Sequence, residues 1–314
     1  MIIRPMVESD LDSVLSCPVD APFRWATPKS MAANLESGTY RHDRVWLAVD
    51  DDGIAARAVW WGFAGGPPLA LDCLYVRDDF ATGPQGLAAR LLSTAHNRFL
   101  ADGLTELPEH HMFLPVGWRE DTTVAAEVAW RKDVLASVGM TEELERHQFV
   151  WTPDRGIPDP PSRLVFRPEP DDERFAEVFR QVAVDTLDVT TRKELTRMDA
   201  MTQAREDLAM YRQMPGDRDW WRLAYTPDGE LVGLAIPSAN NGGPVVGYLG
   251  VVPRFRGRGH VDELLAEITR VLAANGAEKI RADTDFGNLP MANAFERVGY
   301  RRTGVRMVVG APVG

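Results

Sequence analysis

Two glycines and three arginines separate a short apolar segment from an amphipathic one. Residues 245–252 are apolar, Pro253 follows, and the run 261–274 has leucine, isoleucine and valine at helical spacing. A strand, a glycine loop and a helix in this order leave main-chain N–H groups unpaired at the helix start, where the helix dipole adds positive charge. Glycine at 257 and 259 lets a bulky anion approach the backbone. We therefore expect the loop to bind a phosphate-containing ligand, the alternative being a purely structural turn.

The spacing of this loop resembles that of a known family. Leu249-x-Val251-x-Pro253, followed by Arg254-x-x-Gly257-x-Gly259, is similar to the acyl-CoA-binding signature of the GNAT superfamily of acetyl-CoA-dependent N-acyltransferases. It differs from dinucleotide and nucleoside-triphosphate loops, which need a G-x-G-x-x-G or a G-K-[ST] pattern. The resemblance implies acetyl-CoA as co-substrate, with its pyrophosphate on the amides of residues 257–262 and its pantetheine beside the preceding strand. The cofactor-binding residues that it implies here are Leu249, Gly250, Val251, Arg254, Arg256, Gly257, Arg258, Gly259, His260, Val261 and Asp262.

A second stretch, residues 288–300, resembles the other signature of the family, N-x-x-A-x-x-L-Y-E-x-x-G-F, with some variation in spacing. The resemblance implies that Asn288 contacts the cofactor, although alone it is typical of a helix cap or a turn. Phe295 is also expected beside the cofactor. It stands where many members carry a tyrosine, the proposed acid for the departing thiolate, and phenylalanine has no proton to give. Tyr300 is expected to be a core aromatic.

Two side chains are candidates for catalysis. Asp283 alternates with Arg281 and Asp285 along a predicted strand, so the three project to one face. A carboxylate in a partly dry cleft can accept a proton from an amine, and some family members carry a catalytic glutamate near this position. A salt bridge with Arg281 or a neighbouring arginine is the alternative for Asp283. Tyr248 could hydrogen-bond the amine or pack as a core aromatic.

The residues at the start of the predicted cofactor helix have open roles. His260 is the only histidine close to either motif in sequence, and it could act in catalysis or serve the cofactor with its main chain alone. Asp262 is expected to stabilise the helix through its dipole. The other five histidines are too scattered to predict a metal site.

Composition limits the classes of protein to which the chain could belong. Its 314 residues suffice for two domains. A formal net charge of -11 argues against a nucleic-acid partner. The chain has no run of 18 apolar residues and no signal-peptide layout, so we expect a soluble, cytoplasmic protein that does not bind membranes. Cys17 and Cys73 cannot form a disulfide framework or a metal cluster and are expected to be buried thiols.

The order of predicted elements is repeated. A strand and an acidic helix start open the chain, and a hairpin over 44–61, a strand over 69–76 and helices over 87–100 and 124–138 follow, with a closing strand at 148–151. A proline-rich stretch, 153–161, is typical of a linker. Residues 164–168 then echo residues 2–5 and open a second cycle. Its helices are predicted over 175–184, 191–214, 261–274 and 291–298, with strands over 221–237, 245–252, 279–284 and 300–309. The turn at 83–86 lacks the glycine-arginine pattern of the second cycle and has Pro84 where donors would be needed.

The sequence thus predicts an α/β fold of two GNAT-like domains in tandem, each with a mostly antiparallel mixed sheet flanked by helices. Residues 1–152 form a degenerate copy that serves as scaffold, 153–162 a linker, and 163–314 an acetyl-CoA-binding catalytic domain. The predicted function is N-acetyl transfer to a primary amine of a small molecule by direct attack, in a monomer or homodimer without metal. The alternative is a non-catalytic acyl-CoA sensor or partner-binding protein. The acidic balance favours a cationic acceptor.

Overall fold

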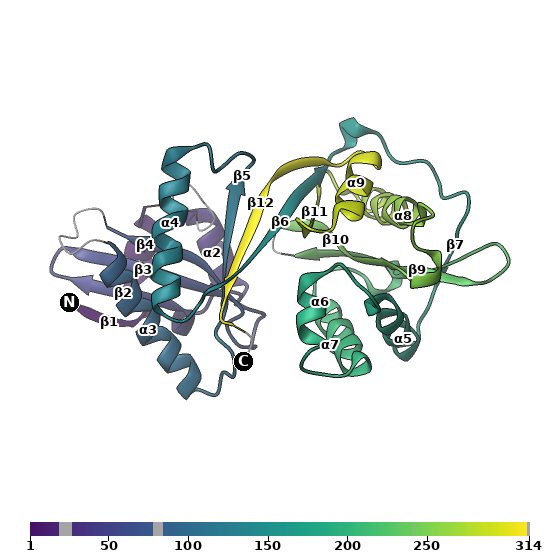
Figure 1. Cartoon of the computed structure of the whole chain (residues 1–314). Coiled ribbons are helices and arrows are strands. Elements are labelled where there is room, and N and C mark those ends of the chain that lie inside the picture. Colours follow the sequence, from purple (N-terminus) through teal and green to yellow (C-terminus); the bar gives the residue numbers. More distant parts are fainter. Residues whose placement is uncertain (19–26, 78–83, 241, 313–314) are drawn as a thin grey trace. The chain divides into compact units, whose positions relative to one another are not determined.

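The computed structural model describes residues 1–18, 27–77, 84–240 and 242–312. They form a mixed α/β fold in which mostly antiparallel strands are flanked by helices (Figure 1). The chain divides into two compact units, and we call Met1–Glu145 with Val305–Gly314 unit 1 and Arg146–Gly304 unit 2. Within the described ranges, every helix is too short or too polar to span a bilayer.

Unit 1 contains strands in the order β1-β2-β3-β4-β5, with β12 next to β5. The first three pairings are antiparallel, and β4 and β5 run parallel. Its elements are β1 (Ile2–Pro5), η1 (Glu8–Asp10), α1 (Leu11–Ser16), α2 (Pro28–Glu36), η2 (His42–Arg44), β2 (Val45–Asp50), β3 (Gly53–Trp61), β4 (Ala70–Val76), α3 (Pro84–Ala101), β5 (Glu109–Pro115), α4 (Thr122–Ser137) and the start of β6 (Glu142–Trp151).

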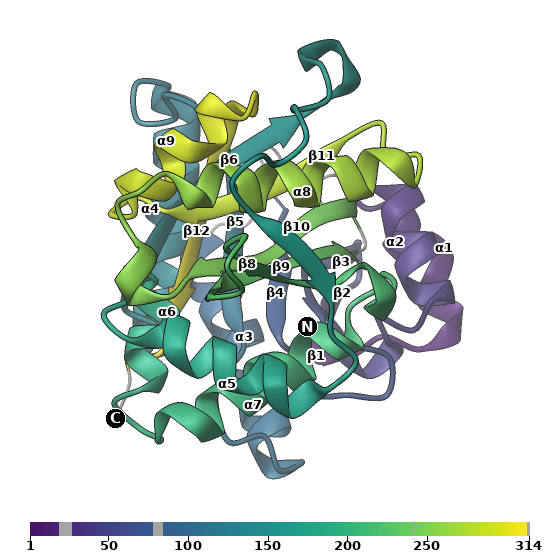
Figure 2. The ribbon, with the colours of Figure 1, turned by 90° about the vertical axis from the view of Figure 1, so that its right-hand side faces the viewer.

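Unit 2 has the strand order β7-β8-β9-β10-β11-β6. Figures 1 and 2 agree that α8 and α9 cover one face of these strands and that α5, α6 and α7 cover the other. Its elements are η3 (Pro153–Arg155), β7 (Val165–Pro168), α5 (Asp172–Ala183), α6 (Val189–Glu194), α7 (Ala200–Gln213), η4 (Arg218–Trp220), β8 (Arg222–Tyr225), β9 (Leu231–Asn240), β10 (Gly243–Val251), η5 (Pro253–Phe255), α8 (His260–Ala274), β11 (Ile280–Asp285), α9 (Leu289–Arg297) and the start of β12 (Arg301–Gly310).

The two units follow the same order of element types but exchange their last strands. The end of β6 pairs antiparallel with β11, from Trp151 opposite Ile280 to Arg146 opposite Asp285, although the sequence of β6 closes the first cycle. Most of β12, which closes the second cycle, belongs to unit 1. The compact units therefore divide at residues 145/146 and 304/305, not at the linker 153–162.

Local sequence explains most of the elements. The hairpin of β2 and β3 closes with Asp50 opposite Gly53, whose φ of 107° favours glycine. The predicted helix over 191–214 is two helices, because Asp199 accepts hydrogen bonds from two amides and starts α7 as its N-cap. β5 and α2 were not predicted. The predicted donor-poor turn at 83–86 lies mostly in α3, and residues 78–83 before it lie outside the described residues.

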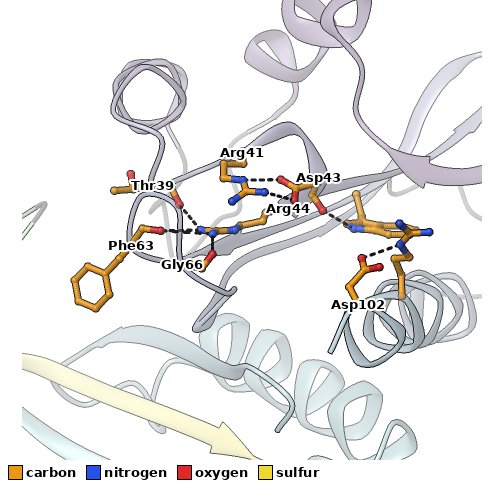
Figure 3. Close-up of polar contacts among 9 residues, drawn as sticks. Thr39, Arg41, Asp43, Arg44, Phe63, Gly66 and Asp102 are labelled. Carbon is orange, nitrogen blue, oxygen red and sulfur yellow. Dashed lines mark hydrogen bonds and ion pairs between the residues drawn. The ribbon is translucent and has the colours of Figure 1, made fainter. Parts of the chain in front are cut away.

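A buried arginine organises one loop of unit 1 (Figure 3). The guanidinium of Arg44 donates to the carbonyl oxygens of Thr39 and Phe63 at 3.5 Å and to that of Gly66. A β-carbon on residue 62 would lie 2.6 Å from Arg44 Nη1, so glycine is required there. Burial lowers the pKa of Arg44. The carbonyls replace the water that this cation loses on burial, which fixes the loop after β3. Cys17 and Cys73, in the same unit, are both buried, as expected.

Candidate active site

The loop between β10 and α8 has the main-chain geometry of an anion site. Gly257 and Gly259 have φ angles of 75° and 74°, in the left-handed region that glycine adopts without strain. Gly259 is the N-cap residue of α8 and gives the helix start no side-chain acceptor. Among the residues that the structure describes, the amides of residues 257–261 have no hydrogen-bond acceptor. Consecutive donors therefore remain available at the positive end of α8.

Arg163 and Glu263 fix the orientation of this loop. Arg163 donates to Glu263 Oε1 at 2.6 Å and to the carbonyl oxygens of Arg258 and Gly259 at 2.9 and 3.1 Å. Because the carbonyl and the N–H of a trans peptide point in opposite directions, these bonds turn the amides of residues 259 and 260 away from Arg163. Glu263 also accepts from the amides of residues 162–164. Burial disfavours its carboxylate, but the bonds from Arg163 and these amides prevail and lower its pKa.

Arg256 ties the loop to the end of α5. Its guanidinium donates to the carbonyl oxygens of Val251 at 3.0 Å and Val182 at 2.7 Å. It also donates to those of Val184 at 2.7 Å and Asp185 at 3.2 Å, and Asp185 has a φ of 50°, which is uncommon outside glycine. The sequence placed Arg256 beside a pyrophosphate. The structure corrects this role, because all three guanidinium nitrogens are bound to carbonyls, and Arg256 positions the loop instead.

Arg254 and Arg258 are exposed on the loop. Arg254 lies 3.2 Å from the Glu230 carboxylate, and its guanidinium is 4.8 Å from the ring centroid of Phe255. The guanidinium of Arg258 is 5.4 Å from the same centroid. Exposed ion pairs of this kind are weak, so both cations can turn towards an anion at little cost.

The first turn of α8 contains the remaining loop residues of the prediction. The ring of His260 packs edge-on to Phe255 at 5.9 Å, and burial, with Arg163 nearby, lowers its pKa. Its buried Nδ1 has no hydrogen-bond partner within the described ranges. Val261 is half-buried. Asp262 forms a bidentate ion pair with Arg297 at the end of α9, at 2.7 and 2.9 Å, so its side chain joins two helices.

β10 is an interior strand whose second half is only partly covered. It lies between β9 and β11, yet residues 246–251 are half-buried. A register shift at Gly247 interrupts its pairing with β9, and its pairing with β11 is given by Val245 opposite Arg281. A β-carbon on Gly250 would lie 2.2 Å from Val182, so only glycine lets α5 pack against this strand. Leu249, Gly250 and Val251 are thus partly covered residues just before the loop, and the Val251 carbonyl already accepts from Arg256.

Tyr248 lies among aromatic side chains from α5 and α7. Its ring centroid is 4.8 Å from that of Phe179 and 5.8 Å from that of Tyr211. Burial, followed by the charges of Asp207 and Asp188, raises the pKa of Tyr248. Across the described ranges, neither the Tyr248 nor the Tyr211 hydroxyl has a hydrogen-bond partner. Two phenolic O–H groups are therefore available to a bound molecule beside β10.

A group of acidic residues next to these tyrosines was missed by the sequence analysis. Gln203 Nε2 donates to Asp207 Oδ2 at 2.6 Å and to Glu194 Oε2 at 3.1 Å. Burial and the nearby negative charge of Glu194 raise the pKa of Asp207 to about 7. Gln203, Asp207 and Tyr211 follow one another at four-residue intervals on α7, which places them on one helix face. That spacing was the one signal in the sequence that could have found them.

Asp283 is held in an ion-pair group centred on Arg146. Arg146 Nε lies 2.7 Å from Asp285, and its terminal nitrogens lie 3.7 Å from Asp283 and 3.9 Å from Asp188. The structure thus shows the salt-bridge alternative for Asp283, while Arg281 donates to the carbonyl of Gly242. Arg146 was missed because β6 was assigned to the first domain.

The second signature contributes to the helix start and the core. Asn288 is the N-cap residue of α9 and accepts from the amide of Met291 at 3.4 Å. Phe295 is 1% exposed and stacks on Phe149 at 4.8 Å. The structure therefore corrects its predicted place beside the cofactor, because a side chain sealed in the core cannot contact a ligand at the surface. Tyr300 is also buried, as expected, with its hydroxyl 2.8 Å from that of Thr269.

The comparison with protein families concerns this same unit. Residues 190–300, from α6 to the end of α9, match the acetyltransferase (GNAT) family. This part of unit 2 is therefore similar to GNAT acetyltransferases. The match includes β10, the glycine loop, α8 and the acidic face of α7 but not Arg146 or Arg163.

Solved structures with the same fold extend over both units. A GCN5-related N-acetyltransferase from Sphaerobacter thermophilus is 19% identical with a TM-score of 0.61, over 98% of this chain and 94% of that one. A GCN5-related glucosamine N-acetyltransferase region of a fungal multi-domain GH3 beta-N-acetylglucosaminidase is 15% identical with a TM-score of 0.60, over 98% of this chain and 38% of that one. A tandem GNAT protein from the clavulanic acid biosynthesis pathway is 15% identical with a TM-score of 0.53, over 100% and 99%. At these identities the likeness shows the fold alone.

Proposed function

We infer that unit 2 binds acetyl-CoA at the loop before α8 and transfers its acetyl group to a primary amine of a small molecule. The observation that carries this proposal is the row of unpaired amides at residues 257–261, held in place by Arg163 and Arg256. A pyrophosphate supplies the acceptors that these amides lack, and Arg254 and Arg258 add mobile positive charge.

The rest of the acetyl-CoA molecule, beyond its pyrophosphate, would lie along the partly covered half of β10. The amides of the pantetheine arm would pair with main chain of the partly covered Leu249 and Gly250, which would bring the thioester next to Tyr248. A thioester supplies an activated acyl carbon, so transfer to an amine needs no acyl-enzyme. Tyr248 and Tyr211 offer hydroxyls that can orient the amine or give a proton to the leaving thiolate, a role that buried Phe295 cannot fill.

Unit 1 is proposed to serve as scaffold. Its β4 has the same place in the element order as β10, and in this unit Arg131 from α4 donates to the carbonyl of Leu74 on β4 at 3.2 Å. An arginine side chain thereby uses main chain that a pantetheine arm would need in a donor-binding copy.

Binding of acetyl-CoA tests the loop directly. We expect Gly257→Ala to weaken binding at least tenfold by calorimetry, because its β-carbon obstructs the amides and its φ of 75° disfavours alanine. Gly276→Ala is the matched control, since Gly276 has a φ of 84°, lies at the far end of α8 and has open space around it. Equal affinity of the two variants and the wild type would refute the binding site.

Thiol release from acetyl-CoA tests the transfer. The acceptor panel should include an aminoglycoside, a polyamine, an amino acid and a peptide with a free N-terminus. Release above the buffer rate with at least one of them supports the enzyme. Tight binding of acetyl-CoA without thiol release would favour the alternative, a CoA-binding sensor.

A further inference from the structure

The acidic face of α7 lies one aromatic contact away from the proposed thioester position. Asp207 precedes Tyr211 by one helical turn, and the Tyr211 ring contacts that of Tyr248 at 5.8 Å. Tyr248 in turn directly precedes the main chain of residues 249–251. Besides burial, the negative charge of Asp207 raises the pKa of both tyrosine hydroxyls.

Gln203 holds Asp207 in one orientation and leaves part of its carboxyl unused. Gln203 is 1% exposed, and its Nε2 bonds Asp207 Oδ2 at 2.6 Å. Across the described residues, Asp207 Oδ1 has no hydrogen-bond partner, and the buried Oε1 of Gln203 has none either. Burying the Gln203 oxygen without a hydrogen-bond donor lowers the stability of the fold. The ammonium group of a ligand, or a proton on the Asp207 carboxyl, would supply such a donor.

The charges around Asp207 favour a positively charged ligand. Glu194 and Asp188 face it from α6 and the residue that caps α6, and Glu206 adds a charge from its own helix. Tyr211 and Tyr248 complete the surroundings. Two cations act on these tyrosines, and both have other partners: Arg146, near Tyr211, is paired with three other carboxylates, and Arg256, near Tyr248, is bound to main-chain carbonyls. The surroundings of Asp283 are less negative, because the Arg146 guanidinium lies 3.7 Å from its carboxylate.

We propose that Asp207, rather than Asp283, is the base that accepts the proton of the acceptor's ammonium group. This inference rests on the proposed function. The ammonium gives one proton to the Asp207 carboxylate, the freed lone pair forms the C–N bond with the acetyl carbon, and the C–S bond breaks. The sulfur leaves as thiolate, and the second proton on nitrogen passes to the thiolate, which yields the amide and CoA thiol. Asp207 then returns its proton to solvent.

The protonation state of Asp207 suits this task. With a pKa of about 7, the carboxyl is ionised in a large fraction of molecules at neutral pH and still binds a proton well. The rate should therefore rise with pH until Asp207 is ionised, and removing a neighbouring negative charge should move that rise to lower pH.

The test measures kcat/KM against pH, with acetyl-CoA and spermidine as a polycationic probe and with the best acceptor of the panel. For the wild type we expect a rise with an apparent pKa of about 7. Asp207→Asn should lower kcat/KM by about 10² to 10⁴-fold and abolish the rise, because general bases contribute this much. Asp207→Glu should restore part of the rate and the rise.

Three further variants separate a chemical role from a structural one. Glu194→Gln should move the rise to lower pH, which a merely structural residue would not do. Asp283→Asn should keep the rise. Glu278→Gln, an exposed carboxylate beyond the far end of α8 and outside this acidic group, is the matched control and should keep both rate and profile within about threefold. Acetyl-CoA affinity of each variant, measured by calorimetry, shows that the domain is intact.

The outcomes divide clearly. If Asp207→Asn binds acetyl-CoA, turns over within threefold of the wild type and keeps the rise, Asp207 is not the base while the transfer itself stands. If instead the wild type binds acetyl-CoA but releases no thiol with any amine, the transfer is refuted, and the role of Asp207 with it.

Discussion

Replacing Asp207 with asparagine should make the protein more stable above pH 7 while leaving its stability near pH 4 unchanged. Asparagine has nearly the same shape and can still accept the bond from Gln203. Below about pH 4 both side chains are neutral, so little changes. At pH 8 the wild type carries a charge in a site that burial and Glu194 make unfavourable for it, whereas the variant does not.

The sign follows from proton linkage. The folded protein holds the Asp207 proton up to a pKa of about 7, whereas an unfolded aspartate releases it near 3.9. Between these values the folded state binds more protons, so the free energy of unfolding falls as pH rises and is lowest above 7. A shift of about three units corresponds to about 4 kcal/mol at 1.36 kcal/mol per unit. Because solvent reaches part of the side chain, we expect a gain of about 2 to 4 kcal/mol for the variant at pH 8.

Urea denaturation between pH 4 and pH 8, followed by tryptophan fluorescence and circular dichroism, measures this gain. Groups that titrate equally in both proteins cancel in the difference, which should grow from near zero to its full size across the window. Glu278→Gln, an exposed carboxylate that does not act on Asp207, is the control, and its difference from the wild type should stay flat within about 0.5 kcal/mol. A flat difference for Asp207→Asn, or a less stable variant at pH 8, would refute the assignment of a buried, proton-binding carboxyl.

Other substitutions test the support of the loop. Arg256→Met should lower the free energy of unfolding by about 2 to 4 kcal/mol, since four hydrogen bonds from a charged donor are lost. Arg258→Met should leave stability nearly unchanged and weaken acetyl-CoA binding, most strongly at low salt. Urea denaturation measures the stability and calorimetry the binding, and equal effects of the two variants on both would contradict this division of roles. Gly250→Ala should destabilise by about 1 to 3 kcal/mol, because its β-carbon would lie 2.2 Å from stiff, buried Val182, and an unchanged melting temperature would show that α5 can yield. Glu263→Gln should lower the free energy of unfolding above pH 5 and have less effect as the pH falls below 4. The pKa of Glu263 is lowered in the folded protein, so the stabilisation that its carboxylate provides is lost when it is protonated. A difference in melting temperature between variant and wild type that does not depend on pH would contradict this.

Local signals in the sequence predicted the parts of the fold and site that depend on local chemistry. The left-handed conformations at Gly257 and Gly259 and the start of α8 follow from residue types within a few positions, and so did the hairpins. The direction of Arg256 could not be predicted in this way, since three of its four carbonyl partners lie more than 70 residues earlier at the end of α5. Phe295 was misplaced for the same reason, because its burial depends on Phe149 in β6.

The exchange of β6 and β12 also lies beyond local signals, since pairing between strands far apart in the sequence decides which unit each completes. It has a consequence for Arg146. That residue lies in unit 2 although its strand closes the first cycle, and it neutralises carboxylates that unit 2 supplies, including nearly buried Asp285. Removing one partner of such a pair leaves a buried charge without compensation.

A fragment that begins at residue 163, the predicted start of the catalytic domain, should therefore fail to form a stable unit, whereas a fragment of residues 142–304 should fold. The shorter one lacks β6, so β11 loses its antiparallel neighbour and becomes an edge, and the core loses Phe149 and Trp151, both of which are fully buried. Loss of each aromatic side chain alone costs about 3 to 5 kcal/mol, which together approaches the whole stability of a typical domain. We expect circular dichroism, thermal melting and acetyl-CoA binding of the two purified fragments to show which of them folds. Cooperative melting of the 163–314 fragment with undiminished acetyl-CoA affinity would show that β6 is not needed to complete unit 2.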